Sequence, residues 1–412
     1  MAEQYDLIVV GGGIAGSSLA GTVAQAGARV LVLERERAFK DRVRGEWVAP
    51  WGVVEAEQLG TLEVLREHAH AHDLPFHHTG VHALSHQADN LVERSTVHRP
   101  ALAFFHPDAQ EALLGWAIEQ GAEVIRGARV TAVTAGETPS VEWGGNATRG
   151  ESSRQDGGGT ASGRLVVGAD GRTSLVRKAF GREEQSRGAT RLWAGVRLKN
   201  LDWPSDTGMT MFDPVSGLSC GLFPQVDGSA RVYLGFMGEE RKRLSGARDL
   251  GAFLDGLNTL LGDRDVFGAA EAVGPLATFD VEMRWVETPY EDGLALIGDA
   301  AGYTDPTWGQ GLALGFRDAR VLSEALAEQS DWRVAAASYA MEHDRYFGNV
   351  VTAESWVDEL LFTAGAEGDA VRARVLPAWG ADHTRNPDAS FNGPEFDASE
   401  EGRRRYFALD LV

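Results

Sequence analysis

The stretch that decides the fold lies near the amino terminus and reads Asp6-Leu7-Ile8-Val9-Val10-Gly11-Gly12-Gly13-Ile14-Ala15-Gly16. Its apolar run at 7–10 predicts a buried parallel strand. Gly11, Gly13 and Gly16 occupy the glycine positions of a G-x-G-x-x-G turn. In such a turn the first glycine permits a tight bend and the second lets the backbone approach a pyrophosphate. The third lets the following helix pack close to the strand.

The residues after the turn continue the pattern of a nucleotide-binding unit. Apolar residues at helical spacing predict a helix from Ala15 to about Gln25, and Gly27 ends it. A second strand over 29–33 leads to Glu34, about 20 residues beyond the glycines, where an acid accepts hydrogen bonds from a ribose 2′-hydroxyl. A carboxylate here would repel a 2′-phosphate. The motif therefore predicts FAD or NAD, the alternative being a glycine-rich turn in another kind of α/β protein.

The bulk composition limits the class of protein. At 412 residues we expect two domains or more. No run approaches the roughly 18 apolar residues of a membrane span, and the early first strand leaves no room for a signal peptide. The single cysteine, Cys220, fits a reducing cytoplasm. A net charge of −21 disfavours nucleic-acid and membrane partners, and simple solubility accounts for it.

Two charged stretches invite a functional interpretation. A basic segment follows Glu34, and its position suggests that Arg35 and Arg44 reach back to the cofactor, the alternative being a solvated loop. The stretch 68–106 is rich in histidine. It contains no His-Glu-x-x-His and no cysteine partner, so we expect surface or pocket-rim histidines and no metal site.

The middle of the chain changes from alternating strands and helices to consecutive strands. Residues 53–70 and 107–121 read as helices, and the low-complexity stretch 144–163 as a mobile loop without chemistry. A buried strand then ends at the turn Asp170-Gly171. Short strands between 192 and 236, with Asp227-Gly228 as a hairpin turn, predict an antiparallel sheet. Residues 247–268 read as helix and 274–286 as strand.

A third motif follows at 293–311. Gly293-Leu294-Ala295-Leu296-Ile297-Gly298-Asp299 is another buried strand ending at an acid, and a glycine-rich loop then opens a long helix near Gly309. The chain to about 376 reads as further helix, and 380–412 reads as a polar tail.

With these motifs the chain resembles the FAD-dependent monooxygenases of the para-hydroxybenzoate hydroxylase type, the single-component aromatic hydroxylases. The resemblance covers 6–34, 168–177 and 293–319, in the family's order. It implies an α/β fold with a Rossmann-like FAD-binding domain over 1–75, 100–185 and 286–330. An antiparallel-sheet substrate domain would be inserted over 76–99 and 186–285, and a helical C-terminal region with its tail would follow over 331–412.

The resemblance also assigns site residues by position. Asp299 would bond a ribityl hydroxyl, and Gly311 and Leu312 would offer backbone N–H groups to the isoalloxazine. Gln110 would contact the flavin or its ribityl chain, and Ala15 the pyrophosphate. The candidate cofactor residues are Gly11, Gly13, Ile14, Ala15, Gly16, Glu34, Arg35, Arg44, Gln110, Val130, Asp170, Asp299, Gly311 and Leu312. The candidate substrate residues are Pro306, Trp308, Phe223, Tyr233 and Trp193.

Two positions depart from the family pattern, since Gly302 stands where many relatives have His and Ala313 where they often have Asn. A side-chain contact to the flavin ring is therefore in doubt. No obligatory catalytic acid or base stands out. His82, His98, Tyr233 and Tyr303 are candidates for positioning a phenol.

The activity that the resemblance implies uses NAD(P)H and O₂. Through a flavin C4a-(hydro)peroxide, the enzyme would hydroxylate or epoxidise an apolar, aromatic small molecule, as in secondary metabolism. The N-terminus of the helix near Gly309 would stabilise the reduced flavin anion. Whether a separate reductase delivers the electrons stays open.

Three alternatives differ in chemistry. Gly221-Leu222-Phe223-Pro224 is loosely similar to a substrate motif of geranylgeranyl reductases, without that motif's aromatic residues, so a flavin-dependent reductase of isoprenoid double bonds is the main alternative. A halogenase is disfavoured because 283–289 lacks W-x-W-x-I-P. A non-catalytic FAD- or NAD-binding protein would not need the shaped loop at 306–311.

Overall fold

The glycine motif lies at the centre of a parallel sheet. The structure is a computed structural model that describes residues 3–84, 87–149, 153–156, 158–237, 243–262 and 264–411. Strand β1 (Glu3–Val10) pairs in parallel with β14 (Gly159–Gly168) on one side and with β2 (Val30–Glu34) on the other. The parallel strands β9 (Glu123–Arg126) and β22 (Leu294–Leu296) extend the two sides. Both faces are covered, which explains the continuous apolar runs in these strands.

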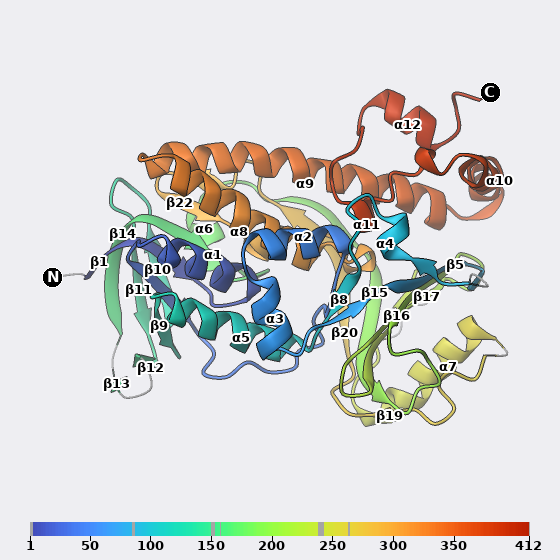
Figure 1. Ribbon diagram of the computed structural model, residues 1–412, viewed down its shortest axis with the longest axis horizontal. Helices are drawn as coiled ribbons and strands as arrows, with labels where there is room; N and C mark the ends of the chain where they lie inside the picture. The colour runs from blue at the N-terminus through green and yellow to red at the C-terminus, as the bar shows by residue number, and fades with distance from the viewer. Residues whose placement is uncertain are drawn as a thin grey trace.

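Three helices pack on one face of this sheet. They are α1 (Ile14–Gln25), α5 (His106–Glu119) and α8 (Gly311–Glu328), and Figure 1 shows α8 and α1 side by side. The inward side chains of Leu7 and Val9 join Leu19, Leu113 and Phe316 in one buried cluster. The predicted helix at 107–121 and the predicted long helix after the third motif are thus confirmed.

Antiparallel strands continue the sheet beyond the parallel strands. They are β10 (Arg129–Thr134), β11 (Ser140–Gly144), β12 (Asn146–Arg149) and β13 (Ser153–Asp156). The prediction of a loop over 144–163 was wrong for the described part of this stretch, which lies largely in β12, β13 and the start of β14. Residues 150–152 and 157 lie outside the described residues. Strand pairing satisfies backbone groups without requiring apolar side chains, so composition did not reveal these strands.

The second sheet is largely antiparallel, as the sequence predicts. Its order is β23 (Gly302–Tyr303), β20 (Ala277–Trp285), β15 (Gln185–Lys199), β18 (Ser229–Phe236), β17 (Leu218–Pro224), β16 (Thr207–Asp213), β5 (Phe76–Val81) and β6 (Ala83–Leu84). The exception is β5, which pairs in parallel with β16. Gly228 at the β17–β18 turn has φ 77°, a backbone conformation that favours glycine. Helix α7 (Leu250–Leu261) packs against this sheet.

Smaller elements complete the fold. They are β3 (Trp47–Val48), α2 (Pro50–Gln58), α3 (Leu62–His68), β4 (His72–Leu74), β7 (Asp89–Asn90), α4 (Leu91–Arg94), β8 (Ala101–Ala103), α6 (Leu175–Ala179), η1 (Ala247–Asp249), β19 (Glu271–Ala272), β21 (Tyr290–Glu291), η2 (Gly298–Ala300) and η3 (Pro306–Trp308). Of these, β21 joins the first sheet, β7 and β19 join the second, and β3, β8 and β4 form a three-stranded sheet. The single helix predicted over 53–70 is two, separated around Gly60 with φ 74°. The helix predicted over 247–268 ends earlier, because Gly262 with φ 60° follows α7.

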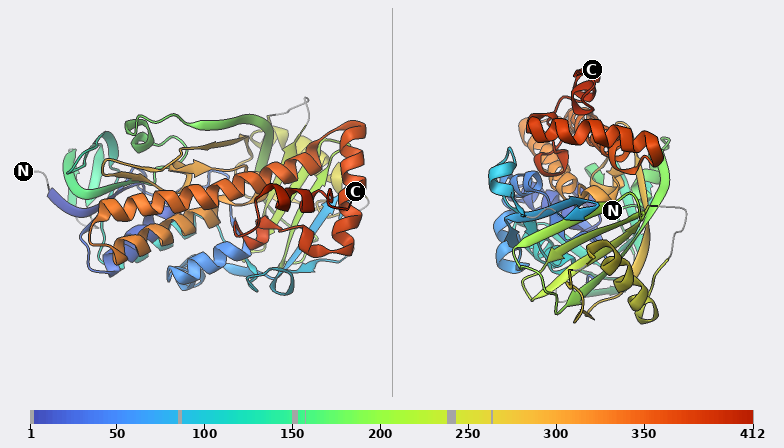
Figure 2. Two further views of the ribbon diagram at one scale, coloured as in Figure 1. Left: turned by 90° about the horizontal axis from the view of Figure 1, so that it is seen from above. Right: turned by 90° about the vertical axis from the view of Figure 1, so that its right-hand side faces the viewer.

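The C-terminal region contains helices as far as Tyr406. Helix α9 (Trp332–Phe362) has 31 residues and is about 46 Å long, and Figures 1 and 2 show it running from the parallel sheet to the second sheet. It is followed by α10 (Gly365–Ala381), η4 (His383–Arg385), α11 (Ala389–Asn392) and α12 (Glu400–Tyr406).

The predicted polar tail over 380–412 was therefore wrong. Tyr406 and Phe407 are each 1% exposed and pack in one cluster with Trp356 and Leu360 of α9. Their apolar side chains stand among many charged residues, so the sequence pattern did not show that this segment is packed. Within the described residues, no helix is both long and apolar enough to cross a membrane.

The packing of Gly16 yields a first prediction. A Cβ atom there would collide with the carbonyl oxygen of Gly11, so we expect Gly16→Ala to lower the free energy of unfolding by about 1–3 kcal/mol. Gly115→Ala in α5 is the control, since nothing lies within 4 Å of its added Cβ and alanine favours a helix. Urea denaturation measures both variants, and a Gly16→Ala protein as stable as the wild type would contradict the close packing.

Candidate active site

The first cavity lies where the parallel strands end. It has a volume of about 630 Å³, and its walls include the residues that follow β1, β2, β14 and β22. In open parallel sheets this edge is the usual place for a ligand. Gly13 precedes α1 without a side-chain cap, and Ile14 and Ala15 line the cavity. The uncapped N–H groups and the positive end of the helix suit a pyrophosphate.

Glu34 is held in a fixed orientation at this cavity. Its Oε2 accepts a hydrogen bond from the Gly12 N–H at 2.7 Å, and its Oε1 accepts one from the Glu36 N–H at 2.7 Å. The residue is only 6% exposed. Each carboxylate oxygen keeps a second lone pair, so the group can also accept bonds from ribose hydroxyls.

The structure brings the predicted cofactor residues together. All of them except Gly16 line this one cavity, including Arg35, Gln110, Val130 and Asp170. Gly16 lies behind the glycine turn, where its lack of a side chain lets α1 approach β1. Gly16 therefore positions the site without forming its wall.

One acid organises the end of the cavity that lies beyond β22. The Asp299 carboxylate is 3.7 Å from the Arg44 guanidinium and 3.5 Å from that of Arg172. Sequence reasoning missed Arg172, although it directly follows Asp170-Gly171. These cations and the Asp299 carboxylate offer both donors and acceptors to a polar chain.

The N-terminus of α8 lies at the same end of the cavity. Gly309 adopts φ 68°, and a Cβ there would lie 2.7 Å from the Trp47 ring. The Gln310 side chain is engaged elsewhere, because it accepts a bond from Trp51 Nε1 at 3.1 Å and donates one to the Trp308 carbonyl at 2.6 Å. No side chain caps α8, and Gly311 and Leu312 line the cavity. The free N–H groups expected from the sequence are thus present.

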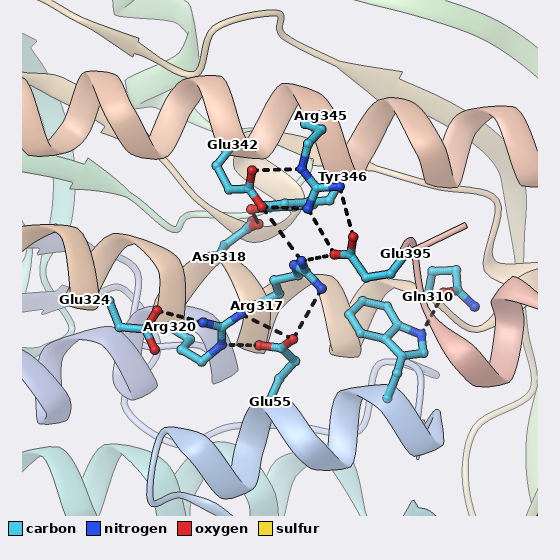
Figure 3. A network of polar contacts seen from close by, with 11 residues as sticks. Glu55, Gln310, Arg317, Asp318, Arg320, Glu324, Glu342, Arg345, Tyr346 and Glu395 are labelled. Carbon is cyan, nitrogen blue, oxygen red and sulfur yellow. Dashed lines mark hydrogen bonds and ion pairs between the residues drawn. The ribbon is translucent and has the colours of Figure 1, made fainter. Parts of the chain in front are cut away.

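A charge network with a buried centre at Arg317 and Glu55 and an exposed rim fixes α8 from its other side (Figure 3). Arg317 pairs with Glu55 of α2 at 3.4 Å and with Glu395 beyond α11. Arg320 bonds the same Glu55 at 2.5 Å, and Arg345 of α9 bonds Glu395 at 2.9 Å. The central pair of Arg317 and Glu55 is buried and is therefore screened little by salt, whereas the Arg345–Glu395 pair is exposed. The network therefore ties α8 to α2, α9 and the C-terminal segment together.

Asp318 connects α8 to the loop that carries Asp299. Its Oδ2 accepts a bond from the Gly298 N–H at 2.6 Å, and its Oδ1 accepts one from the Tyr346 hydroxyl. Burial raises the pKa of the Asp318 carboxyl. This contact sets the position of the loop relative to α8.

The two departures from the family pattern have packing reasons. A Cβ at Gly302 would lie 2.6 Å from the Phe347 ring, so no side chain fits there. A Cβ on Gly52 of α2 would lie 2.8 Å from Ala313 Cα, so α2 lies directly against residue 313. A larger residue at 313 would have to displace α2.

A second cavity of about 650 Å³ adjoins the first. Their shared walls are Arg42, Arg44, Gly45, Trp47, Arg172, Pro306 and Gly309. Most of the other walls of the second cavity come from the second sheet, α9 and residues 376–406, and the rest from the segments around Glu46, Arg94 and Trp308. A ligand here would lie next to the occupant of the first cavity.

The predicted substrate residues all line this second cavity, which we call the aromatic cavity. Trp193 donates a hydrogen bond to Thr307 Oγ1 at 3.0 Å, and the Tyr233 hydroxyl donates one to the Arg44 carbonyl at 2.7 Å. Trp308 packs against Phe212 with ring centroids 5.3 Å apart. Trp308 is thus both a packed residue and a cavity wall.

The residues expected to position a phenol lie in different places. His82 and His98 are exposed and line neither cavity; His82 pairs with Asp213 at 3.0 Å. Tyr303 lines the first cavity only. His77, which the sequence did not single out, is 1% exposed and lines the aromatic cavity, with Nε2 3.1 Å from Thr210 Oγ1. Burial lowers its pKa to about 3, so its imidazole stays neutral.

The C-terminal region supplies walls that sequence reasoning missed. They include Val350, Glu354 and Trp356 of α9, and Phe391 and Tyr406 beyond it. The sequence predicted helix over this part of the chain, but a helical pattern does not separate residues in a core from residues at a cavity.

A protein-family model described as "FAD binding domain" matches residues 4–345. The chain therefore belongs to this family, the FAD-dependent monooxygenases of the para-hydroxybenzoate hydroxylase type, and is an FAD-dependent oxidoreductase. The predicted family and α/β fold class are confirmed. The residues of the first cavity fit FAD: an uncapped helix end for the pyrophosphate, an oriented acid for the ribose, and Asp299 for the ribityl chain.

Curated relatives include enzymes of two chemistries. The rifampicin monooxygenase of Streptomyces venezuelae is 30% identical over 332 residues, which cover 80% of this chain and 65% of the relative. Digeranylgeranylglycerophospholipid reductase 2 of Methanopyrus kandleri is 26% identical over 365 residues, covering 83% of this chain and 82% of the relative.

Solved structures support the fold. The p-nitrophenol 4-monooxygenase PnpA from Pseudomonas putida DLL-E4 is 20% identical with a TM-score of 0.74, covering 99% of this chain and 98% of that one. The flavin-dependent brominase Bmp2 is 17% identical with a TM-score of 0.74, covering 99% of each chain.

The oriented carboxylate of Glu34 yields a second prediction. Glu34→Ala removes the acceptor for the ribose, and we expect FAD to bind roughly 10- to 100-fold more weakly, since hydrogen bonds to charged groups contribute about 1.5–3 kcal/mol. Glu63→Ala, at an exposed position of α3, is the control. Titration of the apoprotein with FAD measures both, and unchanged affinity in Glu34→Ala would rule out this contact.

The lowered pKa of His77 yields a third prediction, on the pH dependence of stability. Its pKa is lowered in the folded protein, so below the ordinary value of 6.5 the unfolded chain takes up a proton that the folded chain does not. Stability from this residue is complete above pH 6.5 and falls with pH, by about 2 kcal/mol at pH 5. We expect His77→Gln to lose less stability than the wild type between pH 7 and pH 5 in urea denaturation. Equal losses would show that His77 is protonated in the folded state.

Proposed function

We propose that this protein is an FAD-dependent monooxygenase that uses NAD(P)H and O₂ to hydroxylate or epoxidise an apolar, aromatic small molecule. The observation that carries the proposal is the shared wall: the cavity that fits FAD ends at Pro306 and Gly309, where the aromatic cavity begins. The rifampicin monooxygenase relative supports an oxygenation reaction.

The residues of this chain would bind, orient and exclude water. Bound FAD supplies the redox chemistry with the nicotinamide donor and O₂. The uncapped N-terminus of α8 places partial positive charge at Gly311 and Leu312, where it would favour an anionic group. Trp193, Phe223 and Trp308 line the adjoining cavity with aromatic surface, which excludes water and holds a flat substrate.

The site assignments above are part of this proposal, as is the division into an FAD-binding domain, a substrate domain and a C-terminal helical region. A cytoplasmic location agrees with the single cysteine, Cys220, which is buried. A role in secondary metabolism agrees with the similarity to a monooxygenase that is named for rifampicin.

A flavin-dependent reductase of isoprenoid double bonds is the second candidate. The similarity to a digeranylgeranylglycerophospholipid reductase over 83% of this chain favours it. The two candidates differ in their need for O₂ and in the origin of any new oxygen atom in the product.

The test is a reaction with NADPH and 1-naphthol under ¹⁸O₂. We expect a yellow protein that releases FAD, NADPH oxidation stimulated by the probe, and one ¹⁸O atom in the product by mass spectrometry. Asp299→Ala should lose most of the FAD and the activity with it. A colourless protein that takes up no FAD, or a product that forms under strict anaerobiosis, would contradict the monooxygenase proposal, and the anaerobic product would favour the reductase.

A further inference from the structure

Among the described residues, the charged side chains that line the aromatic cavity are paired, with one exception. Each arginine that lines the cavity lies within 4.0 Å of a carboxylate. The acids Glu46 and Asp388 each lie within the same distance of an arginine. The pairs are Arg42–Glu36, Arg44–Asp299, Arg172–Asp299, Glu46–Arg231 and Arg94–Asp388. Glu354 also lines the cavity, and it forms no ion pair within that distance with any described residue.

Glu354 is buried in α9 with half of its carboxyl group unused. The residue is 4% exposed. Its Oε2 accepts a long hydrogen bond of 3.4 Å from the Asp305 N–H, and the Thr304 side chain lies near the carboxyl group, but the buried Oε1 has no partner at hydrogen-bond distance and angle among the described residues. Leaving a buried oxygen unbonded costs about 1–3 kcal/mol, so such an atom is expected to meet a ligand or water.

The form of this carboxyl group follows from its surroundings. Burial raises the pKa of Glu354 well above its ordinary value, and the nearby Asp358 carboxylate raises it further, against the opposing effects of Thr304 and Arg191. This shift favours the protonated form, in which the group offers one O–H donor together with acceptor oxygens. It suits a hydroxyl or N–H partner and offers nothing to compensate an anion.

The position of Glu354 connects it with the reaction. Asp305, which bonds it, directly precedes Pro306 in the wall shared by both cavities. Trp308 and Trp356 line the aromatic cavity on the same two segments. A ligand group bonded to Glu354 would thus lie beside the shared wall with its rings against aromatic surface. A carboxylate ligand would find every arginine of the cavity already paired.

We propose that Glu354 binds a hydroxyl or N–H group of an uncharged aromatic substrate and so orients the substrate ring beside the Pro306 loop. This inference rests on the proposed function. The substrate class is neutral aromatic compounds with a hydrogen-bonding group, and Glu354 selects for that group. Removing the carboxyl should abolish the advantage that the polar group confers on binding.

A purely structural role for Glu354 predicts something different. If the side chain only held Asp305, its loss would weaken the binding of every ligand to the same degree. The ratio of affinities for a ligand with the polar group and one without it would then stay constant. This ratio separates the two roles.

The experiment measures three probes with one ring system: 1-naphthol, naphthalene and 1-naphthoate. Equilibrium dialysis against the FAD-loaded protein at pH 7, without NADPH, gives each dissociation constant. For the wild type we expect 1-naphthol to bind roughly ten-fold more tightly than naphthalene, and 1-naphthoate no more tightly than naphthalene. Glu354→Met keeps the volume and removes the carboxyl, so it should reduce the ten-fold preference to less than two-fold.

Two further variants serve as controls. Glu354→Gln keeps hydrogen-bonding atoms at the same place and should retain the preference. Tyr406→Phe removes another buried hydroxyl of the cavity wall that lacks a described partner and should retain it too. Tightest wild-type binding of 1-naphthoate, or a ten-fold preference that survives in Glu354→Met, would overturn the proposal. So would a preference lost in Tyr406→Phe and kept in Glu354→Met.

The wild-type comparison of the three probes needs no variant, so the proposal stays open to refutation even where Glu354→Met fails to fold. Binding is measured without turnover. A failed preference for 1-naphthol would therefore leave the ¹⁸O₂ result standing, and a missing ¹⁸O label would leave the binding result standing.

Discussion

The whole arrangement depends on the close approach of three backbone segments that carry no side chain large enough to separate them. A Cβ on Gly11 would collide with the Ala169 carbonyl oxygen, and one on Gly16 with that of Gly11. This contact joins the end of β1, the start of α1 and the turn that contains Asp170. Because these segments meet backbone to backbone, the uncapped end of α1 and the oriented Glu34 face one cavity. The helix dipole and the carboxylate then act at two neighbouring parts of a dinucleotide, the pyrophosphate and the adenosine ribose.

The second cavity depends on a different physical device. Helix α8 has to present its free N-terminus beside the shared wall, and buried ion pairs through Arg317 and Glu55 hold it there. The same network reaches Glu395, next to the C-terminal segment that closes the aromatic cavity. Breaking one partner of such a pair leaves a charge uncompensated, which makes the geometry costly to change. The charges thus connect the cofactor end of the molecule to its substrate end.

Sequence reasoning succeeded where the signal is local. The strands around Gly11 and Asp299 are continuous apolar runs because both faces are buried, and their following loops carry the cofactor residues within a few positions. Only some of the residues that line the aromatic cavity were predicted, since its walls come from segments far apart in the chain. Glu354 and Tyr406 have the same helical spacing as core residues, and only the folded structure separates a cavity wall from a core. The strands at 146–149 and 153–156 were not predicted, because backbone pairing leaves little trace in the amino-acid composition.

The proposed function requires the flavin ring of FAD to lie at the wall shared by the two cavities while the FAD adenosine lies at Glu34. A crystal structure of the FAD-loaded protein tests this directly. We predict density for the adenine ribose against Glu34 and for the isoalloxazine ring beside Pro306, Gly311 and Leu312, facing the aromatic cavity. Density for FAD in the opposite direction, or a ring bound away from Pro306 with the aromatic cavity closed off from it, would contradict the account.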